Sequence, residues 1–216
     1  MNTYTPDPQY KPDVASDSQG NFVVVWQSPF QDGYGYGIFG QRYAASGARL
    51  GAEFQINTST SGDQVDPAVA RGAAGDFVVT WRGKDEDVDG TVARRFSPGG
   101  VPIGSDFRVN TYTTSDQLHP KVALLGNGNI VVTWESIGQD GSFSAVYAQR
   151  YACGVLGDTD GNGTVAVADV FYLINTLFAG GPAPVCSADV DASNTVNVSD
   201  VFYLINYLFA QGPPPV

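Results

Sequence analysis

The chain has 216 residues, a net charge of −11 and a charged fraction of only 15%, together with 26 Gly, 13 Pro and 12% aromatic residues. A hydrophobic content of 43% is that of a chain that folds, and turn residues mixed with aromatic ones favour short strands over long helices. The charge excludes nucleic acid as a partner, because a phosphate backbone recruits patches of Lys and Arg. No apolar run approaches the roughly 20 residues that cross a bilayer, so we expect no membrane span.

The first domain, residues 1–152, is predicted to consist of three tandem β repeats. Their approximate bounds are 1–56, 57–109 and 110–152. In each copy an Asn-Thr pair leads to an apolar, β-branched run of the kind found in buried strands, and the runs end at Trp26, Trp81 and Trp134. A third strand follows each tryptophan, and a fourth begins at Glu53 and at Asp106. Four short strands in about 50 residues is the size of a propeller blade.

The third copy lacks a fourth strand, since Tyr151 runs directly into Ala152 and Cys153. A propeller usually needs at least four blades to close. Either more blades lie upstream, or the three copies form an open stack or an oligomer. The start of the chain lacks the features of a signal peptide, so we expect a fragment of a secreted or surface protein. The copies resemble tandem blade-like repeats of bacterial surface proteins.

No motif for catalysis stands out in these repeats. His119, the only histidine, precedes Pro120 where the other copies carry Lys11 and Asp66. A position that varies between copies favours a surface or strand-end role over that of a catalytic base. We therefore expect no catalytic residue, and a protein that is not an enzyme.

The second domain, residues 153–216, contains a different repeat, whose two copies align without a gap at an offset of 31 residues. Each copy is a 12-residue loop followed by a helix of about 11 residues, predicted at 169–179 and 200–210. A calcium loop needs hard oxygen ligands at alternate positions. The first loop offers Asp158, Asp160, Asn162, Thr164 (through its carbonyl) and Asp169. The second offers Asp189, Asp191, Ser193, Thr195 and Asp200.

The charge pattern supports two bound calcium ions. All six charged residues between Gly154 and Val216 are aspartates at loop positions 1, 3 or 12, and no Lys or Arg lies among them. Without a cation, each loop would force three carboxylates together. Magnesium is the second choice of ion, because the loops supply more protein oxygens than its water-retaining octahedron takes. The other interpretation is that the aspartates only cap the helices.

Each predicted helix carries an apolar stripe, and we expect the two helices to pack on one another. The stripes contain Val170, Leu173, Ile174, Leu177 and Phe178 in the first helix and Val201, Leu204, Ile205, Leu208 and Phe209 in the second. Four more aromatic residues are either core or a partner surface: Phe171, Tyr172, Phe202 and Tyr203.

A duplicated loop–helix unit with aspartate at position 12 and no preceding helix resembles the dockerin family. The resemblance covers residues 154–216 and implies a small two-helix module of paired F-hands. Together with the propeller-like four-stranded β repeats predicted above, it gives a multidomain β + α fold. It also implies a cohesin-like partner and a secreted or cell-surface bacterial protein. The family reads its partner at loop positions 10 and 11, here Val167, Ala168, Val198 and Ser199.

Cys153 and Cys186 lie just before the two loops, and in a secreted protein such a pair is most simply a disulfide. Two free thiols are the alternative. The function we expect is a non-catalytic secreted protein, whose calcium-binding module tethers or caps repeats that bind a surface or carbohydrate ligand. The alternatives are the C-terminal accessory part of a larger extracellular carbohydrate-active hydrolase, and a structural adhesin with no cohesin partner.

Overall fold

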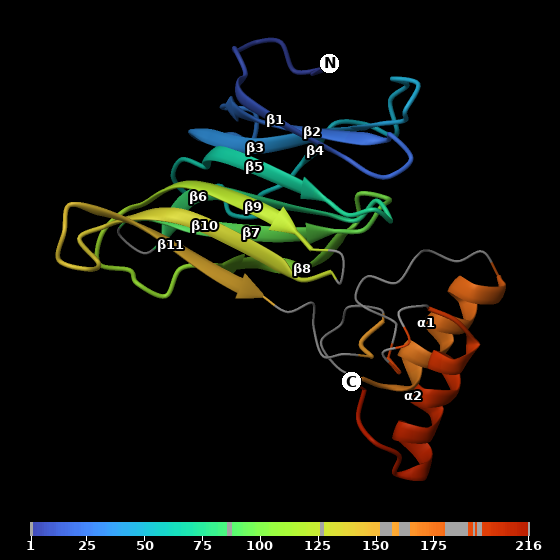
Figure 1. Cartoon of the computed structure of the whole chain (residues 1–216). Helices are drawn as coiled ribbons and strands as arrows, with labels where there is room; N and C mark the ends of the chain where they lie inside the picture. Colours follow the sequence, from blue (N-terminus) through green and yellow to red (C-terminus); the bar gives the residue numbers. More distant parts are fainter. Residues whose placement is uncertain are drawn as a thin grey trace. The chain divides into compact units, whose positions relative to one another are not determined.

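The structure is a computed structural model, which describes residues 2–85, 88–125, 128–151, 157–159, 165–179, 190–191, 193 and 196–215. Within these residues, eleven strands form three sheets and two helices follow them (Figure 1). The chain divides into two compact units: residues 1–125 with 130–150, and residues 126–129 with 151–216. In the described part, no helix is long and apolar enough to span a membrane.

The first two sheets have four antiparallel strands each, in the simple order of the chain. The first sheet contains β1 (Tyr10–Ser16), β2 (Phe22–Pro29), β3 (Tyr36–Tyr43) and β4 (Phe54–Gln55). The second contains β5 (Val65–Arg71), β6 (Phe77–Asp85), β7 (Val88–Phe96) and β8 (Pro102–Arg108). Neighbouring strands are joined by short turns in which glycines such as Gly20 and Gly100 take positive φ.

The third sheet has three strands among the described residues, in the order β11-β10-β9. They are β9 (Gln117–Leu124), β10 (Ile130–Ile137) and β11 (Ser144–Tyr151). Side chains along β10 alternate strictly between buried and half-buried, so one face of this sheet is packed and the other is not. β2 is buried on both faces almost throughout, as the sequence predicts.

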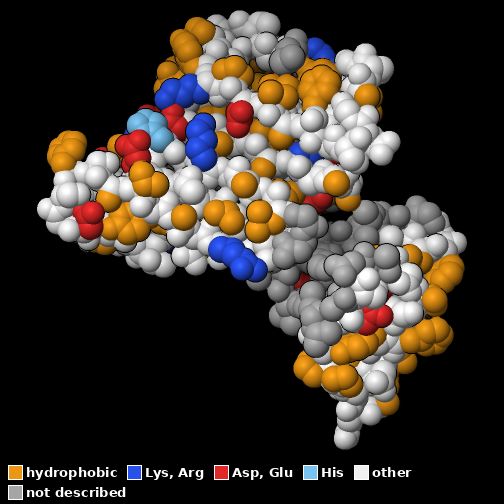
Figure 2. All heavy atoms as spheres, in the orientation of Figure 1, with side chains coloured by type: hydrophobic (Ala, Val, Ile, Leu, Met, Phe, Trp, Pro, Cys, Tyr) orange, Lys and Arg blue, Asp and Glu red, His pale blue; other side chains and the backbone are white. Residues whose placement is uncertain are grey.

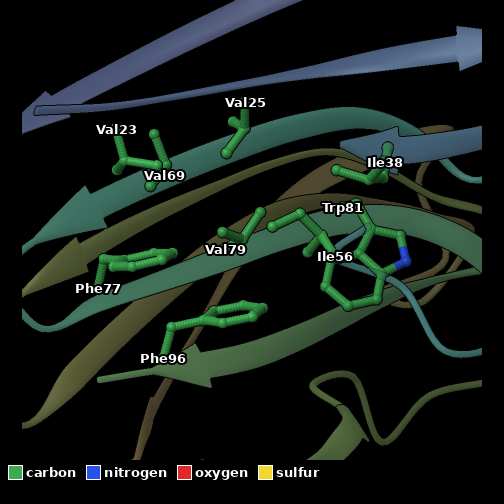
Figure 3. Close-up of a cluster of buried hydrophobic side chains, with 9 residues drawn as sticks. All are labelled: Val23, Val25, Ile38, Ile56, Val69, Phe77, Val79, Trp81 and Phe96. Atoms are coloured by element: carbon green, nitrogen blue, oxygen red, sulfur yellow. The ribbon is translucent and has the colours of Figure 1, made fainter. Parts of the chain in front are cut away.

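The core of the β-sheet unit lies between stacked sheets. Figure 3 shows Val23, Val25 and Ile38 of the first sheet facing Trp81 and the aromatic rings of the second. The full cluster contains Val23, Val25, Ile38, Ile56, Val69, Phe77, Val79, Trp81 and Phe96. The rings of Phe77 and Phe96 stack with centroids 4.9 Å apart. The sheets are therefore held by apolar burial, with one tryptophan as its largest member.

Three sheets followed by two helices agree with the predicted β + α organisation. The finer statements, that the sheets are copies of one repeat and blades of a propeller, stay proposals. The domain boundary at residues 152 and 153 also stays a prediction, because both residues lie outside those the structure describes.

The two helices are α1 (Val167–Phe178) and α2 (Val198–Ala210), each beginning two residues before its predicted start. The reason is a cap: the aspartate at loop position 12 is the third helical residue, and its carboxylate accepts a hydrogen bond from the backbone at position 9. The helices pack through Val170, Leu173, Val201 and Leu204, as expected. The prediction for the two terminal phenylalanines is wrong, since Phe178 is 67% and Phe209 66% exposed.

Candidate functional site

The candidate metal centre lies where each loop meets its helix. Asp169 and Asp200, at loop position 12, are both fully buried at 0% exposure. Asp158, which opens the first loop, is 1% exposed. Aspartates are rarely buried, because a carboxylate loses its hydration unless hydrogen bonds or a cation replace it. The burial of these three aspartates therefore points to such partners in the loops.

The second loop wraps its backbone around Asp200. One carboxylate oxygen accepts hydrogen bonds from the N–H of Val190 at 2.8 Å and of Asp191 at 3.4 Å, and the other accepts from the N–H of Asn197 at 2.8 Å. The Asn197 side chain in turn accepts from the N–H of Ser199 at 2.8 Å and caps α2. These hydrogen bonds fix the position of the carboxylate, and Oδ2, which accepts one of them, keeps a further lone pair for a cation.

The first loop repeats this arrangement around Asp169. Its Oδ2 accepts from the N–H of Ala166 at 2.8 Å, and the hydroxyl of Thr159 donates to its backbone carbonyl at 2.8 Å. Ala166 provides no side-chain cap, so α1 lacks the bond that Asn197 gives α2. The two loops therefore share one design but differ in how firmly the helix is capped.

These residues fit a calcium ion. Their donors are carboxylate oxygens, which calcium prefers, and the whole segment from Gly154 to Val216 contains no Lys or Arg to balance them. Among the described residues no three His, Cys, Asp or Glu side chains gather in one cluster. Five of the predicted ligands lie outside the described residues: Asp160, Asn162, Thr164, Asp189 and Thr195. Cys153 and Cys186 also lie outside them, so the disulfide stays a prediction.

The residues predicted to read a partner lie exposed in the first turn of each helix. Val167 and Val198 are 44% and 45% exposed, and Ala168 and Ser199 are exposed as well. Their role stays a prediction. Sequence reasoning left a second set open, because a spacing pattern alone does not tell a core face from a free one. This set is Phe171, Tyr172, Phe202 and Tyr203.

Four phenylalanines stand out of the helical unit, and Figure 2 shows hydrophobic side chains along it. Phe171, Phe178, Phe202 and Phe209 are between 65% and 67% exposed. Residues four and eleven positions after Val167 point the same way to within about 40°, so Phe171 and Phe178 continue the stripe that begins at Val167. α2 repeats this stripe from Val198. Each helix thus presents one apolar stripe to the outside.

A second candidate site lies in the β-sheet unit, at the first strand of each sheet. A pocket of about 320 Å³ is formed by strands β1, β5 and β9. Its lining is Lys11, Pro12, Asp13, Asp66, Pro67, His119, Pro120 and Lys121. The residue before each of the three prolines has positive φ: 49° at Lys11, 56° at Asp66 and 52° at His119. Such backbone is uncommon for residues other than glycine, and it occurs here at the same place in three sheets.

Charged groups meet around this pocket, and Figure 2 shows basic, acidic and histidine side chains gathered on one face. Lys11 pairs with Asp66, which Arg82 Nε approaches at 3.5 Å. His119 Nδ1 lies 3.4 Å from Glu135. His119 is a surface residue near the start of β9, as predicted, with 61% of its side chain exposed. The sequence did not show that it shares a pocket with Lys11 and Asp66. The signal available in the sequence was a charged or histidine residue before proline in all three repeats.

Comparison with known families assigns the helical unit. Residues 156–209 match the family profile of the dockerin type I domain. The chain therefore carries a dockerin-like module after its β-rich part, which confirms the resemblance predicted from the loops. Domains of this type bind calcium and interact with cohesin modules. Comparison with curated proteins gave no match.

Solved structures resemble this chain at low identity. A protein of unknown function from Dyadobacter fermentans matches with a TM-score of 0.51 at 10% identity, over 70% of this chain and 53% of its own. An endo-arabinase from Bacteroides thetaiotaomicron matches with a TM-score of 0.43 at 15% identity, over 69% of this chain and 58% of its own. An endo-1,4-β-xylanase from the same organism has a TM-score of 0.45 at 12% identity, with 69% and 57% covered.

The chain thus spans little more than half of these proteins, and identities this low concern the fold alone. We correct the expectation that the chain is not an enzyme: glycoside hydrolases are among the matches, and a fold shared at this level excludes no activity. That expectation was drawn from the lack of a local motif in the sequence. Lys11, Asp66 and His119, from three separate sheets, line one pocket without any such motif, so its lack excludes no site.

Proposed function

We propose that this is a dockerin-bearing extracellular protein related to glycoside hydrolases, whose calcium-folded module attaches the β-sheet unit to a cohesin-like module. The match of residues 156–209 to the dockerin type I domain carries the proposal. The aspartates at loop position 12 are buried, and the segment from Gly154 to Val216 contains no Lys or Arg. Both observations support a module that folds around its calcium ions. Bound at the loops, two calcium ions would neutralise the carboxylates and draw each loop closed.

The docking surface follows from the exposed stripes. Large apolar side chains that stand two-thirds exposed at equivalent places of two helices are unusual on a protein without a partner. Phe171 and Phe202 are 66% and 65% exposed while the opposite side of each helix is packed. Since the partner-reading positions Val167 and Val198 are themselves apolar, the proposed recognition is mainly hydrophobic. The near-identical stripes allow a partner to dock in two orientations.

The test is calcium-dependent binding of the full chain to recombinant cohesin modules of the type that dockerin type I domains bind. We expect Phe171→Lys or Phe202→Lys alone to weaken binding modestly, since either stripe serves. The double variant should weaken it by about 100-fold or more, as hot-spot aromatics do. Asp200→Asn should lower calcium affinity at one loop by at least the roughly 10- to 100-fold that loss of an outer-sphere partner costs.

The matched control is Phe143→Lys, which changes an 87% exposed phenylalanine of the β-sheet unit and should leave cohesin binding unaltered. Binding that survives EDTA, or that the double variant does not weaken, would contradict the proposed surface. Failure to bind any cohesin, with two calcium ions bound, would leave the module as a structural cap and refute the tethering function.

For the β-sheet unit, the proposed ligand is a carbohydrate held in the pocket between β1, β5 and β9. Its ammonium, carboxylate and imidazole groups can donate and accept hydrogen bonds to sugar hydroxyls. Arabinan and xylan oligosaccharides are suitable probes, with release of reducing sugar as the readout for hydrolysis and calorimetry for binding. His119→Ala and Lys121→Ala should each reduce affinity. Absence of both heat and hydrolysis across such a panel would refute a carbohydrate ligand.

A further inference from the structure

In each of the first two sheets, the last strand (β4 or β8, called here the outermost strand) is joined to the rest of the β-sheet unit by side-chain hydrogen bonds. An acidic side chain, just before β4 in the first sheet and within β8 in the second, accepts hydrogen bonds from the N–H and hydroxyl of the repeat's first threonine. Thr3 binds Glu53 in this way at 2.6 and 3.0 Å, and Thr58 binds Asp106 at 2.8 and 2.7 Å. The same pair of bonds in two sheets shows that the acid is a recurrent feature of this strand.

The residues that follow the acid along the chain are hydrogen-bonded to the neighbouring strand as well. In the first sheet, the N–H of Ile38 donates to Asn57 Oδ1 at 2.7 Å, and the carbonyl of Ile38 accepts from the N–H of Ile56 at 2.8 Å. Thr91, Asn110 and Val109 repeat these two bonds in the second sheet at 2.7 and 2.8 Å. Ile56 and Val109 are 0% and 1% exposed, so the strand also contributes to the core.

Within the described residues, the third sheet has the residues equivalent to Thr3 and Ile38 but no strand equivalent to β4 or β8. Val146 of β11 aligns with Ile38 and Thr91, counted back from the Gln-Arg-Tyr, Arg-Arg-Phe and Gln-Arg-Tyr endings of the three strands. Within the described residues, β11 is the edge of its sheet and no strand pairs with its outer side. Val146 is 78% exposed, whereas Ile38 and Thr91 are both 0% exposed. Thr111, aligned with Thr3 and Thr58, is exposed too.

We infer that the outer edge of β11 accepts an extended strand from another chain. Its sequence pattern is that of the two strands already seen: an acid, Phe, a polar residue, Ile or Val, and Asn. The backbone of this strand pairs with β11, its acid binds Thr111, and its asparagine accepts from the N–H of Val146. Addition of a strand to a free sheet edge is a general mode of peptide recognition, in which main-chain bonds give affinity and side chains give specificity.

The side-chain pattern of the partner strand makes this binding selective, whereas main-chain pairing alone would accept any extended strand. The acid and the asparagine make the charged and amide contacts described above, four residues apart in both strands. A partner strand therefore needs these two side chains at fixed spacing, and a scrambled strand of the same composition lacks that spacing. The ring of Phe54 lies 5.9 Å from Phe96 and 6.4 Å from Phe77 of the second sheet, measured between centroids, so it contributes to sheet stacking and not to the pairing with β3.

The experiment titrates the full chain, in calcium, into a fluorescent peptide with the sequence of residues 52–58, Ala-Glu-Phe-Gln-Ile-Asn-Thr. We expect saturable binding at one peptide per chain by fluorescence anisotropy, and none with the scrambled peptide. A Glu→Gln peptide should bind about 10-fold more weakly, because it loses hydrogen bonds to a charged group. In the Thr111→Ala protein, Glu→Gln in the peptide should reduce the affinity by less, because the hydroxyl that the glutamate contacts is already missing. This result would place the glutamate at Thr111.

Val146→Pro removes the edge N–H and should abolish binding. If that variant does not fold, the Thr111→Ala cycle still tests the same edge. Phe30→Ala, at a 63% exposed position of the first sheet, is the matched control and should change nothing. The inference is overturned if the peptide and its scramble bind alike, if Thr111→Ala shows no coupling to the peptide's acid, or if the chain forms a dimer that the peptide does not disrupt.

Discussion

At the scale of residues, Asp17 links the first sheet to the second. Its Oδ2 lies 3.1 Å from Arg71 Nη2, with the two side chains only 5% and 3% exposed. Its Oδ1 accepts from the N–H groups of Gln19 and Asn21, both at 2.9 Å. Burial acts to raise the pKa of Asp17, but the bonds from Asn21 and Gln19 and the charge of Arg71 outweigh it, so its pKa lies below the ordinary value.

The lowered pKa sets the sign of a pH effect. A carboxyl group with a depressed pKa in the folded state stabilises it above the unfolded pKa of about 3.9, and this contribution is lost as the pH falls through the folded value. We expect Asp17→Asn to lower the free energy of unfolding by about 1.5–3 kcal/mol at pH 7, the range for a hydrogen bond to a charged group. Urea unfolding of both proteins at pH 7, 5 and 3.5 should show this difference constant down to pH 5 and shrinking below pH 4. A difference independent of pH would show that the charge of Asp17 contributes nothing.

At the scale of elements, the two helices are near copies that differ at their caps. The N-cap residue of α2 is Asn197, whose side chain accepts a hydrogen bond from the N–H of Ser199, while the N-cap residue of α1 is Ala166, which makes no such bond. Both share the aspartate bond to the backbone of the capping residue. Comparing α1 with α2 within this one chain therefore tests how much a single side-chain N-cap hydrogen bond stabilises a helix.

Exchanging the caps should move stability in opposite directions. Asn197→Ala is expected to lower the free energy of unfolding of the helical unit by about 1 kcal/mol, and Ala166→Asn to raise it by a similar amount. Both changes can be followed by far-ultraviolet circular dichroism in urea at a saturating calcium concentration, where the helical unit is folded. An unchanged midpoint for Ala166→Asn would mean that α1 begins elsewhere in solution.

At the scale of the whole molecule, two units with different sources of stability share one chain. The β-sheet unit is held by apolar burial around Trp81, and the helical unit by the loops and a core to which the described residues contribute Val170, Leu173, Val190, Val201 and Leu204. A unit of this length has room for only a small core, so ion binding is expected to supply much of its stability.

Removal of calcium should therefore affect the two units unequally. In scanning calorimetry of the full chain, EDTA is expected to abolish or strongly lower the transition of the helical unit and leave that of the β-sheet unit in place. Restoring calcium should restore the lost transition, with a midpoint that rises with ion concentration. Two transitions that shift together would contradict the independence of the units.

The features that follow from local spacing were predictable. The alternating aspartates and the apolar stripes predicted the loops and the packing of Val170 and Leu173 against α2, since both depend on residues within one turn or one helix. The exposure of Phe178 and Phe209 was not predictable, because periodicity places a side chain on a stripe without saying which stripe is covered.

By itself, the sequence determined the β + α organisation, the position of the helices and the dockerin-like character of the loops. Each of these depends on contacts between residues near in the chain. The sequence also predicted that the third copy lacks a fourth strand, and within the described residues β11 is the edge of its sheet. Only the tertiary structure decided that Lys11, Asp66 and His119 meet at one pocket. This meeting depends on how sheets that start some 55 residues apart stack on one another, and the apolar burial that drives stacking leaves no local pattern in the sequence.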